Sequence, residues 1–397
     1  MATRHLAVPL AVDAVEPRPR ETSPPLIHVL RPRLPSASEL LPYLQEIDQA
    51  RWYSNGGPLV TRLERELSRH FGLPNLGVVT AANCTLGLTA VLLAREVRPG
   101  SLCLMPSWTF AATPHAARAA GLVPFFHDVD QRTWALDPNA VRETLKRQAS
   151  PIGAVMVVSP FGAPIDLHAW EKFEDDTGVP VVVDAAAGFD TARPSRIPSV
   201  VSLHATKILG AGEGGFIITA DPRLRERLTA CCNFGFMDSR KAILPATNAK
   251  MSEYHAAVAL ASLSAWRRIR AGHVEVAERY LPALGSLLQY GYGQGWVAST
   301  TNVVLPPGTR ERITERLLES GIETRAWWGE GCHRQPAFAE CPRGDLAVTE
   351  DLGGRVLGLP HFAEMQPEDV ATVADAMSEA LKSESLRRLS RSIGREE

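Results

Sequence analysis

Short apolar or β-branched runs alternate with longer helix-like segments between residues 36 and 265. The runs predict seven strands, at residues 77–80, 102–105, 123–126, 154–159, 179–184, 200–203 and 215–219. Helices are predicted between them at residues 85–96, 113–120, 138–147 and 166–176. Their starts carry the Asn, Thr, Asp and Pro residues that cap or open helices. Strands separated by helices indicate one large α/β domain around a mostly parallel sheet.

The pattern changes after residue 265. It predicts a long helix at residues 264–281, a strand at 296–305, a helix at 311–320 and a last helix at 367–383. We interpret residues 266–383 as a smaller α+β domain and residues 384–397 as a charged, serine-rich tail that frays. Residues 1–35 are rich in Pro and Arg, which suits an extended arm. We expect this arm to pack on a neighbouring subunit.

The composition excludes several classes of function. The chain has 397 residues, of which 45% are hydrophobic, enough to bury a large core. Its 42 Lys and Arg nearly balance 44 Asp and Glu, so no global field favours nucleic acid or a membrane surface. The six cysteines are scattered without a CxxC pair, as in a reducing compartment. We expect a cytoplasmic protein without a metal site, a signal peptide or a membrane span.

The strongest candidate for chemistry is Lys207, which ends the segment at residues 202–207 and precedes a glycine-rich run at 210–215. A lysine held at a strand end in apolar surroundings can lose its proton and attack a carbonyl, as Schiff-base chemistry requires. A solvated surface lysine beside a turn is the plainer interpretation of this segment alone. The residues that accompany Lys207 therefore decide between the two.

Several other functional-looking residues follow predicted strands, at the sheet edge where α/β proteins bind ligands. Asp184 ends a run of three valines, and Asn83, Cys84 and Thr85 open a helix whose first amides suit a phosphate. Phe110 follows the second strand. Each alone is explained as a helix cap or a core residue. Together, a Schiff-base lysine, a carboxylate for a pyridinium nitrogen, a stacking ring and a phosphate cradle describe a pyridoxal phosphate site.

With these motifs the chain resembles the nucleotide-sugar aminotransferases of the DegT and StrS type, from about residue 51 to 376. The resemblance implies an aspartate-aminotransferase-like large domain with a seven-stranded sheet, a smaller C-terminal domain and pyridoxal 5'-phosphate as cofactor. Its motifs occur in a consistent order at residues 54–58, 83–85, 108–113, 184–186, 202–207, 213–215 and 248–253.

The resemblance gives roles to the residues around the cofactor ring. Lys207 would carry the internal aldimine and then move protons between the carbons of substrate and cofactor. Asp184 would keep the pyridine nitrogen protonated, so that the ring accepts electrons. Phe110 would stack on the ring face.

The resemblance also implies a phosphate cradle and a homodimer with shared active sites. Thr85, the backbone amide of Leu86, and Ser202 would hold the phosphate. Asn248 would reach the phosphate bound by the partner subunit. A plain turn residue is the alternative for Asn248.

Three positions depart from the family pattern. Ala187 stands where relatives carry Gln or His against the ring oxygen, and alanine cannot donate a hydrogen bond. We therefore expect the pKa of the aldimine to move. Cys84 replaces a common glycine and is expected to be a buried filler. Lys250 replaces a common arginine and lacks the planar fork that makes bidentate contacts.

The implied reaction is a ping-pong transfer of an amino group from L-glutamate to a keto group of a nucleotide-linked deoxysugar. Residues 325–330 and 333–335 offer aromatic faces and cations that suit sugar and diphosphate, although tryptophans buried in a small domain explain them equally well. Alternatives are a cyclitol or other non-nucleotide keto substrate, and a non-catalytic regulatory or scaffold relative. Lys207 argues against the dehydratase branch, in which histidine replaces this lysine.

Overall fold

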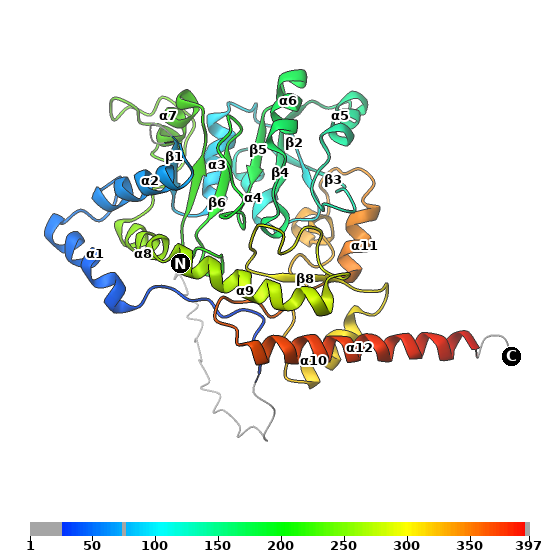
Figure 1. The fold of residues 1–397 in the computed structure, drawn as a ribbon. Helices are drawn as coiled ribbons and strands as arrows, with labels where there is room; N and C mark the ends of the chain where they lie inside the picture. The colour runs from blue at the N-terminus through cyan, green and yellow to red at the C-terminus, as the bar shows by residue number, and fades with distance from the viewer. Residues whose placement is uncertain (1–25, 74–76, 394–397) are drawn as a thin grey trace, which may run out of the picture.

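The computed structural model describes residues 26–73 and 77–393 (Figure 1). Most of the predicted N-terminal arm, residues 1–25, and the last four residues of the predicted tail lie outside this range. The large domain is built on the predicted seven-stranded, mostly parallel sheet, in the order β1-β7-β6-β5-β4-β2-β3. Among its strands, β7 runs antiparallel to both of its neighbours. The expected fold class is therefore confirmed.

The strands are short and almost entirely buried. Helices cover both faces of the sheet, so the strand sequences are continuous apolar runs instead of alternating patterns. The strands are β1 Val78–Ala81, β2 Leu102–Pro106, β3 Val123–His127, β4 Ile152–Val158, β5 Val181–Asp184, β6 Ser199–Ser202 and β7 Gly215–Ile218.

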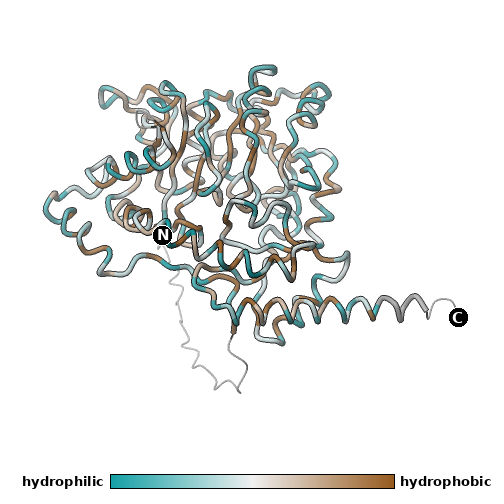
Figure 2. Tube along the Cα trace, viewed as in Figure 1, coloured by the Kyte–Doolittle hydropathy of each residue, from teal (hydrophilic) through white to brown (hydrophobic). Residues whose placement is uncertain are grey.

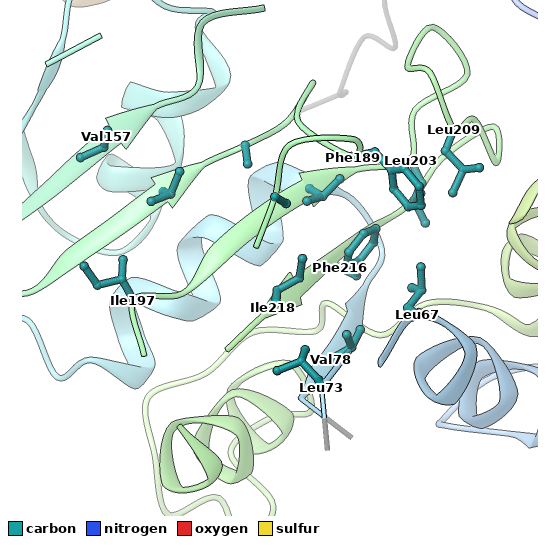
Figure 3. Packing of buried hydrophobic residues seen from close by; sticks show 14 of the residues in the cluster. Leu67, Leu73, Val78, Val157, Phe189, Ile197, Leu203, Leu209, Phe216 and Ile218 are labelled. Carbon is teal, nitrogen blue, oxygen red and sulfur yellow. The ribbon is translucent and has the colours of Figure 1, made fainter. Parts of the chain in front are cut away.

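Successive residues of each strand enter different apolar clusters, as the pleat of a strand requires. In β5, Val181 and Val183 belong to the cluster formed with α2, α5, α6 and α8, whereas Val182 belongs to the cluster formed with α3, α4 and α7. Figure 3 shows part of the first cluster, in which Leu67 of α2 lies near Phe216 of β7. In Figure 2 the strands are predominantly brown and the outer helices carry more teal, which matches this burial.

Many of the helices begin at a side chain that accepts a hydrogen bond from the first turn. Examples are Asn83 for α3, Asp137 for α5, Asp166 for α6, Asp221 for α7 and Ser252 for α8. The helices of the large domain are α1 Ala37–Ala50, α2 Pro58–His70, α3 Cys84–Ala94, α4 Ala112–Ala119, α5 Pro138–Arg147, α6 Leu167–Thr177, α7 Pro222–Cys231 and α8 Glu253–Ser264.

The C-terminal part is a two-stranded antiparallel sheet packed with α9, α10 and α12. Figure 1 shows α9 running across the molecule between the large sheet and α12. The elements are α9 Trp266–Leu284, β8 Thr301–Val304, α10 Arg310–Glu319, α11 Ala347–Arg355, β9 Val356–Leu359 and α12 Pro367–Ile393. None of these helices, and no other helix of the described chain, has the length and apolar character needed to cross a membrane.

Two predicted boundaries in this part are wrong. The strand predicted at residues 296–305 is reduced to β8, because Val297 donates its amide to Asp190 at 3.1 Å instead of joining a ladder. The last helix does not end at residue 383 but continues in α12 to Ile393. Glu384 is buried there and accepts hydrogen bonds from Arg312, which holds this part of the helix against α10. The sequence pattern also missed β9 and α11.

Two segments cross between the expected domains. Residues 332–346 pack on the edge of the large sheet, where the amide of Phe126 donates to the carbonyl of Pro342 at 2.9 Å. In the described part of the arm, Ile27 pairs with Ile322, and the carbonyl of Val29 accepts from the amide of His361 at 3.1 Å. Residues 26–35 of the arm therefore contact the C-terminal part of their own chain.

Candidate active site

A cavity of about 640 Å³ lies at the carboxyl ends of the parallel strands. Asp184 ends β5 and Ser202 ends β6, while Asn83 and Thr109 follow β1 and β2. Six of the predicted site residues line this cavity, namely Thr85, Leu86, Phe110, Asp184, Ser202 and Lys207. The tertiary structure therefore brings together residues that lie more than a hundred positions apart in the chain.

Asp184 is a buried carboxylate that receives two hydrogen bonds. Thr113 donates its hydroxyl to Oδ2 at 2.7 Å, and the amide of Ala186 donates to Oδ1 at 3.1 Å. Thr109 lies behind Thr113, with 2.8 Å between their hydroxyl oxygens. Burial raises the pKa of Asp184, while these donors and Lys207 oppose the rise. An additional cationic N–H donor would favour the charged carboxylate, and a pyridinium nitrogen is such a donor.

Lys207 lies in the turn that follows β6, where its amide donates to the carbonyl of His204 at 2.9 Å. Its side-chain amine has no hydrogen-bond partner within the described residues. Burial lowers the pKa of Lys207, and the nearby Cys84 and Asp184 act in the opposite direction. The amine is thus free to react and easier to deprotonate than an exposed lysine.

The N-terminus of α3 forms one wall of the cavity and is open to an anion. Asn83 caps the helix by accepting a hydrogen bond from the amide of Leu86 at 2.9 Å. The amide predicted to bind phosphate is thus already used by the cap, whereas the amides of Cys84 and Thr85 belong to the first turn and have no acceptor within the helix. Gly215 of β7 allows the start of α3 to pack directly against this strand, since a Cβ at Gly215 would lie 2.8 Å from the nitrogen of Cys84.

Ser202 and Phe110 complete the predicted binding surface. Ser202 is buried, and its Oγ accepts from the amide of His204 at 3.2 Å, so its own hydroxyl proton remains available for an acceptor. Phe110 is 63% exposed, which is unusual for a large aromatic side chain that lines a cavity. Its free face suits stacking against a flat ligand.

The replaced positions Ala187 and Cys84 also lie at the cavity. The backbones of Ala187 and Gly162 are in contact, since a Cβ built on Gly162 would lie 2.6 Å from the carbonyl oxygen of Ala187. Neither the methyl group of Ala187 nor its neighbour Phe161 offers a donor to this side of the cavity. Cys84 is buried, as expected of a filler, and burial raises the pKa of its thiol.

Asn248 does not line the cavity of its own chain. It is exposed in the segment between α7 and α8, where it accepts from the amine of Lys250 at 2.6 Å. The same amine lies 4.0 Å from the ring centroid of Phe234. A function of Asn248 in a second subunit stays a prediction.

The sequence left two explanations for the tryptophans at residues 327 and 328, substrate contact or burial, and the structure agrees with each in part. Trp327 and Trp328 line the cavity, and Trp328 stacks on Phe161 with 3.9 Å between the ring centroids. His333 is buried elsewhere, where Nδ1 lies 2.8 Å from the hydroxyl of Ser107. The adjacent Arg334 pairs with Glu350 at 2.7 Å and does not line this cavity.

The residues fit pyridoxal phosphate on observations independent of the resemblance. The first turn of α3 offers, in the wall of the cavity, amides without an acceptor within the helix, and Asp184 keeps room for a further donor. The amine of Lys207 has no competing partner within the described residues. Sequence reasoning missed Thr113, although a hydroxyl at the start of a helix that follows a strand end was a usable signal.

Comparisons with known proteins agree with this geometry. The sequence model of the DegT/DnrJ/EryC1/StrS aminotransferase family matches residues 36–378. A Mycobacterium tuberculosis protein, Rv3402c, is 33% identical in an alignment of 374 residues that covers 90% of this chain and 90% of the relative. The dTDP-4-amino-4,6-dideoxy-D-glucose transaminase of Shigella dysenteriae is 32% identical, over 89% of this chain and 98% of the relative. The structure of DesI in the presence of its TDP-sugar product superposes with a TM-score of 0.81 and 31% identity, covering 92% of this chain and 96% of DesI.

Proposed function

Since the chain belongs to the DegT/DnrJ/EryC1/StrS aminotransferase family, we propose that it transfers the amino group of L-glutamate to the keto group of a nucleotide-linked deoxysugar. The sequence-based assignments to this family, to its fold and to pyridoxal phosphate-dependent aminotransferases are confirmed. The similarity to the Shigella transaminase and to DesI, whose product is a TDP-sugar, supports the choice of acceptor.

One observation carries the proposal. A lysine amine without a partner in the described residues lines the same cavity as a buried carboxylate and the open N-terminus of a helix. The pyridoxal phosphate of such an enzyme supplies an electron sink for the carbanion formed at the substrate carbon. Lys207 accepts and returns the proton at that carbon, because burial lowers the pKa of its amine and makes the neutral form accessible.

The other residues bind and orient. Asp184 accepts a hydrogen bond from the ring nitrogen and holds its positive charge, with Thr113 fixing the position of the carboxylate. The first amides of α3, the hydroxyl of Thr85 and that of Ser202 bind the phosphate. Phe110 covers one face of the ring and excludes water from it. We further propose a homodimer in which Asn248 contributes to the site of the partner subunit.

A second acceptor class is favoured by a specific observation. Among the residues that line the main cavity, Lys207 is the single Lys or Arg, so this lining offers no further permanent cation to a diphosphate. A cyclitol or another uncharged keto substrate would need none. The nucleotide-linked substrate requires that the partner subunit or the rim of the cavity supply the cation.

Absorbance spectroscopy of the purified holoenzyme tests the proposal. We expect a visible band that L-glutamate bleaches and a keto acid restores. Lys207→Ala should abolish this response, whereas the matched exposed variant Lys241→Ala should keep it. Nucleotide-linked ketosugars and keto-cyclitols are then compared as acceptors that restore the band. A band that ignores every amino donor would overturn the aminotransferase assignment, and recovery with cyclitols alone would overturn the choice of substrate.

A further inference from the structure

A second cavity, of about 350 Å³, borders the main one. It lies between the described part of the arm, α9 and residues 361–364. The two cavities share Leu30, Thr206, Lys207 and Ser299 in their walls. Lys207 therefore lies in the wall that the two cavities share.

A chain of buried hydrogen-bonding groups ends at this second cavity. The hydroxyls of Tyr292 and Thr301 are 2.6 Å apart, and Thr301 lies 2.8 Å from Nδ1 of His361. Nε2 of His361 lies 2.9 Å from Nδ1 of His273. His273 and His361 line the cavity and are only 6% and 1% exposed.

The hydrogen-bonding capacities of these groups give the chain a direction. Nδ1 of His361 lies 3.1 Å from the hydroxyl of Tyr292 and 2.8 Å from that of Thr301. One hydroxyl donates to the other and the second donates to Nδ1, so the proton of His361 is on Nε2. That proton is donated to Nδ1 of His273, whose own proton is then on Nε2. Each direction leaves one donor without an acceptor among the described residues, namely the outer N–H of His273 in this direction and a hydroxyl proton of Tyr292 or Thr301 in the reverse one. Of these three residues, His273 is the one that lines the second cavity, where water or a ligand can accept its proton, so this direction is favoured.

His273 therefore presents an N–H donor for which the described residues supply no acceptor. The imidazole is neutral at pH 7, because burial lowers the pKa of His273 to about 4. Nε2 of His273 is not fully enclosed, so water or a hydrogen-bond acceptor on a ligand in the second cavity can reach it.

The uncompensated charge of the second cavity is positive. Arg33 pairs with Glu364, and Arg268 lies 4.0 Å from Glu39. Glu275, the remaining carboxylate of the wall, pairs with Arg279 outside it. Arg31 also lines the cavity, and nothing in the described part of the chain pairs with it. A neutral N–H donor and a free guanidinium in the walls of one cavity are a combination that suits a carboxylate.

We propose that the second cavity binds the distal carboxylate of the amino donor, with His273 Nε2 and Arg31 as its donors. This inference rests on the proposed function, because the donor's α-amino group would have to displace the amine of Lys207 from the cofactor, and Lys207 lies in the shared wall. The arm and the C-terminal part would then select a dicarboxylic amino acid over one with a short or uncharged side chain. Choice of donor would thus be made in a compartment separate from the one that receives the keto substrate.

The test compares amino donors in the first half-reaction of the holoenzyme. L-Glutamate, L-glutamine and L-alanine bleach the band of the bound cofactor, and kcat/KM is measured for each. Arg31→Gln and His273→Ala should each lower kcat/KM for glutamate by about tenfold while leaving alanine unchanged, as expected for the loss of one charge-assisted hydrogen bond. Arg98→Gln, an exposed arginine that lines neither cavity, is the matched control and should change nothing.

Calorimetry with glutarate separates failure of this inference from failure of the proposed function. Glutarate has two carboxylates and no amino group, so its binding does not depend on turnover. Weaker binding of glutarate to Arg31→Gln supports the inference even if His273→Ala does not fold. An unchanged ratio of glutamate to alanine together with unchanged glutarate binding overturns it, while bleaching by glutamate would still uphold the aminotransferase. If no donor bleaches the band, the proposed function fails and glutarate alone decides whether the cavity binds carboxylates.

Discussion

Replacing Thr113 tests how the structure controls the charge of Asp184. The hydroxyl of Thr113 is buried and donates to Oδ2 of Asp184 at 2.7 Å. Thr113→Val keeps the shape of the side chain and removes this donor. A hydrogen bond to a charged group contributes about 1.5–3 kcal/mol, and one pKa unit corresponds to about 1.4 kcal/mol. The pKa of Asp184, already raised by burial, should therefore rise further, because the charged carboxylate loses this contribution and the protonated carboxyl does not.

The consequence is measured in the pH profile of kcat/KM. A carboxyl group with a higher pKa is protonated at a higher pH and then no longer accepts the hydrogen bond of the ring nitrogen. The acid limb of the profile should therefore move to higher pH by about one pH unit or more. Thr113→Ser keeps the hydroxyl and should keep the wild-type profile. Thr109→Val removes only the outer hydroxyl, 2.8 Å from Thr113, and should give a smaller shift. An acid limb that is identical in Thr113→Val and the wild type would refute the reasoning.

Three further predictions concern stability and cofactor retention. Glu253 is buried and accepts hydrogen bonds from the amides of Leu59 and Val60 at 2.7 and 2.9 Å. Glu253→Gln should lower the free energy of unfolding by about 2 kcal/mol in denaturant titrations. The control Glu226→Gln, at an exposed position, should leave it unchanged. Gly215→Ala places a Cβ 2.8 Å from the amide nitrogen of Cys84 and should speed dissociation of pyridoxal phosphate. Gly344→Ala, whose Cβ meets open space, serves as the control. Equal dissociation rates of the two variants would contradict a phosphate site at the start of α3. The pKa of His273 is lowered from 6.5 to about 4, so the unfolded chain binds a proton that the folded chain does not. The free energy of unfolding should therefore fall as the pH drops from 6.5 to 4, and His273→Asn should flatten that decline.

The sequence was most informative where a strand ends in a reactive side chain. Asp184 and Lys207 were identifiable because a short apolar run leads to each, and the ends of parallel strands meet at one edge of a sheet. Thr85 was identifiable because capping residues mark the start of α3. The use of the Leu86 amide by Asn83 was not visible, since a cap can leave an amide free or occupy it.

The C-terminal part was less predictable. Strand β9 has four residues between α11 and a proline-containing loop, which is too short for a periodic signal. The residue that precedes helix α11 gives it no capping side chain. The cap comes instead from Asp128, just after β3, which accepts hydrogen bonds from the amides of Val348 and Thr349 at 2.8 Å. Helix α12 extends past the predicted end because Glu384 pairs with Arg312.

The sequence by itself determined the seven strands of the large sheet, four of the helices between them and the residue types that can do the chemistry. Hydrophobic period, turn residues and caps act over a few positions, so they can be recognised without a structure. The tertiary structure decided which of these residues meet. It places Glu253 against the start of α2, 194 residues earlier, and so joins two motifs that the sequence shows only as separate. It also aligns Tyr292, Thr301, His361 and His273 beside the wall of Lys207. Such contacts depend on the path of the whole chain, because hydrogen bonds between distant segments form only after packing has brought those segments together.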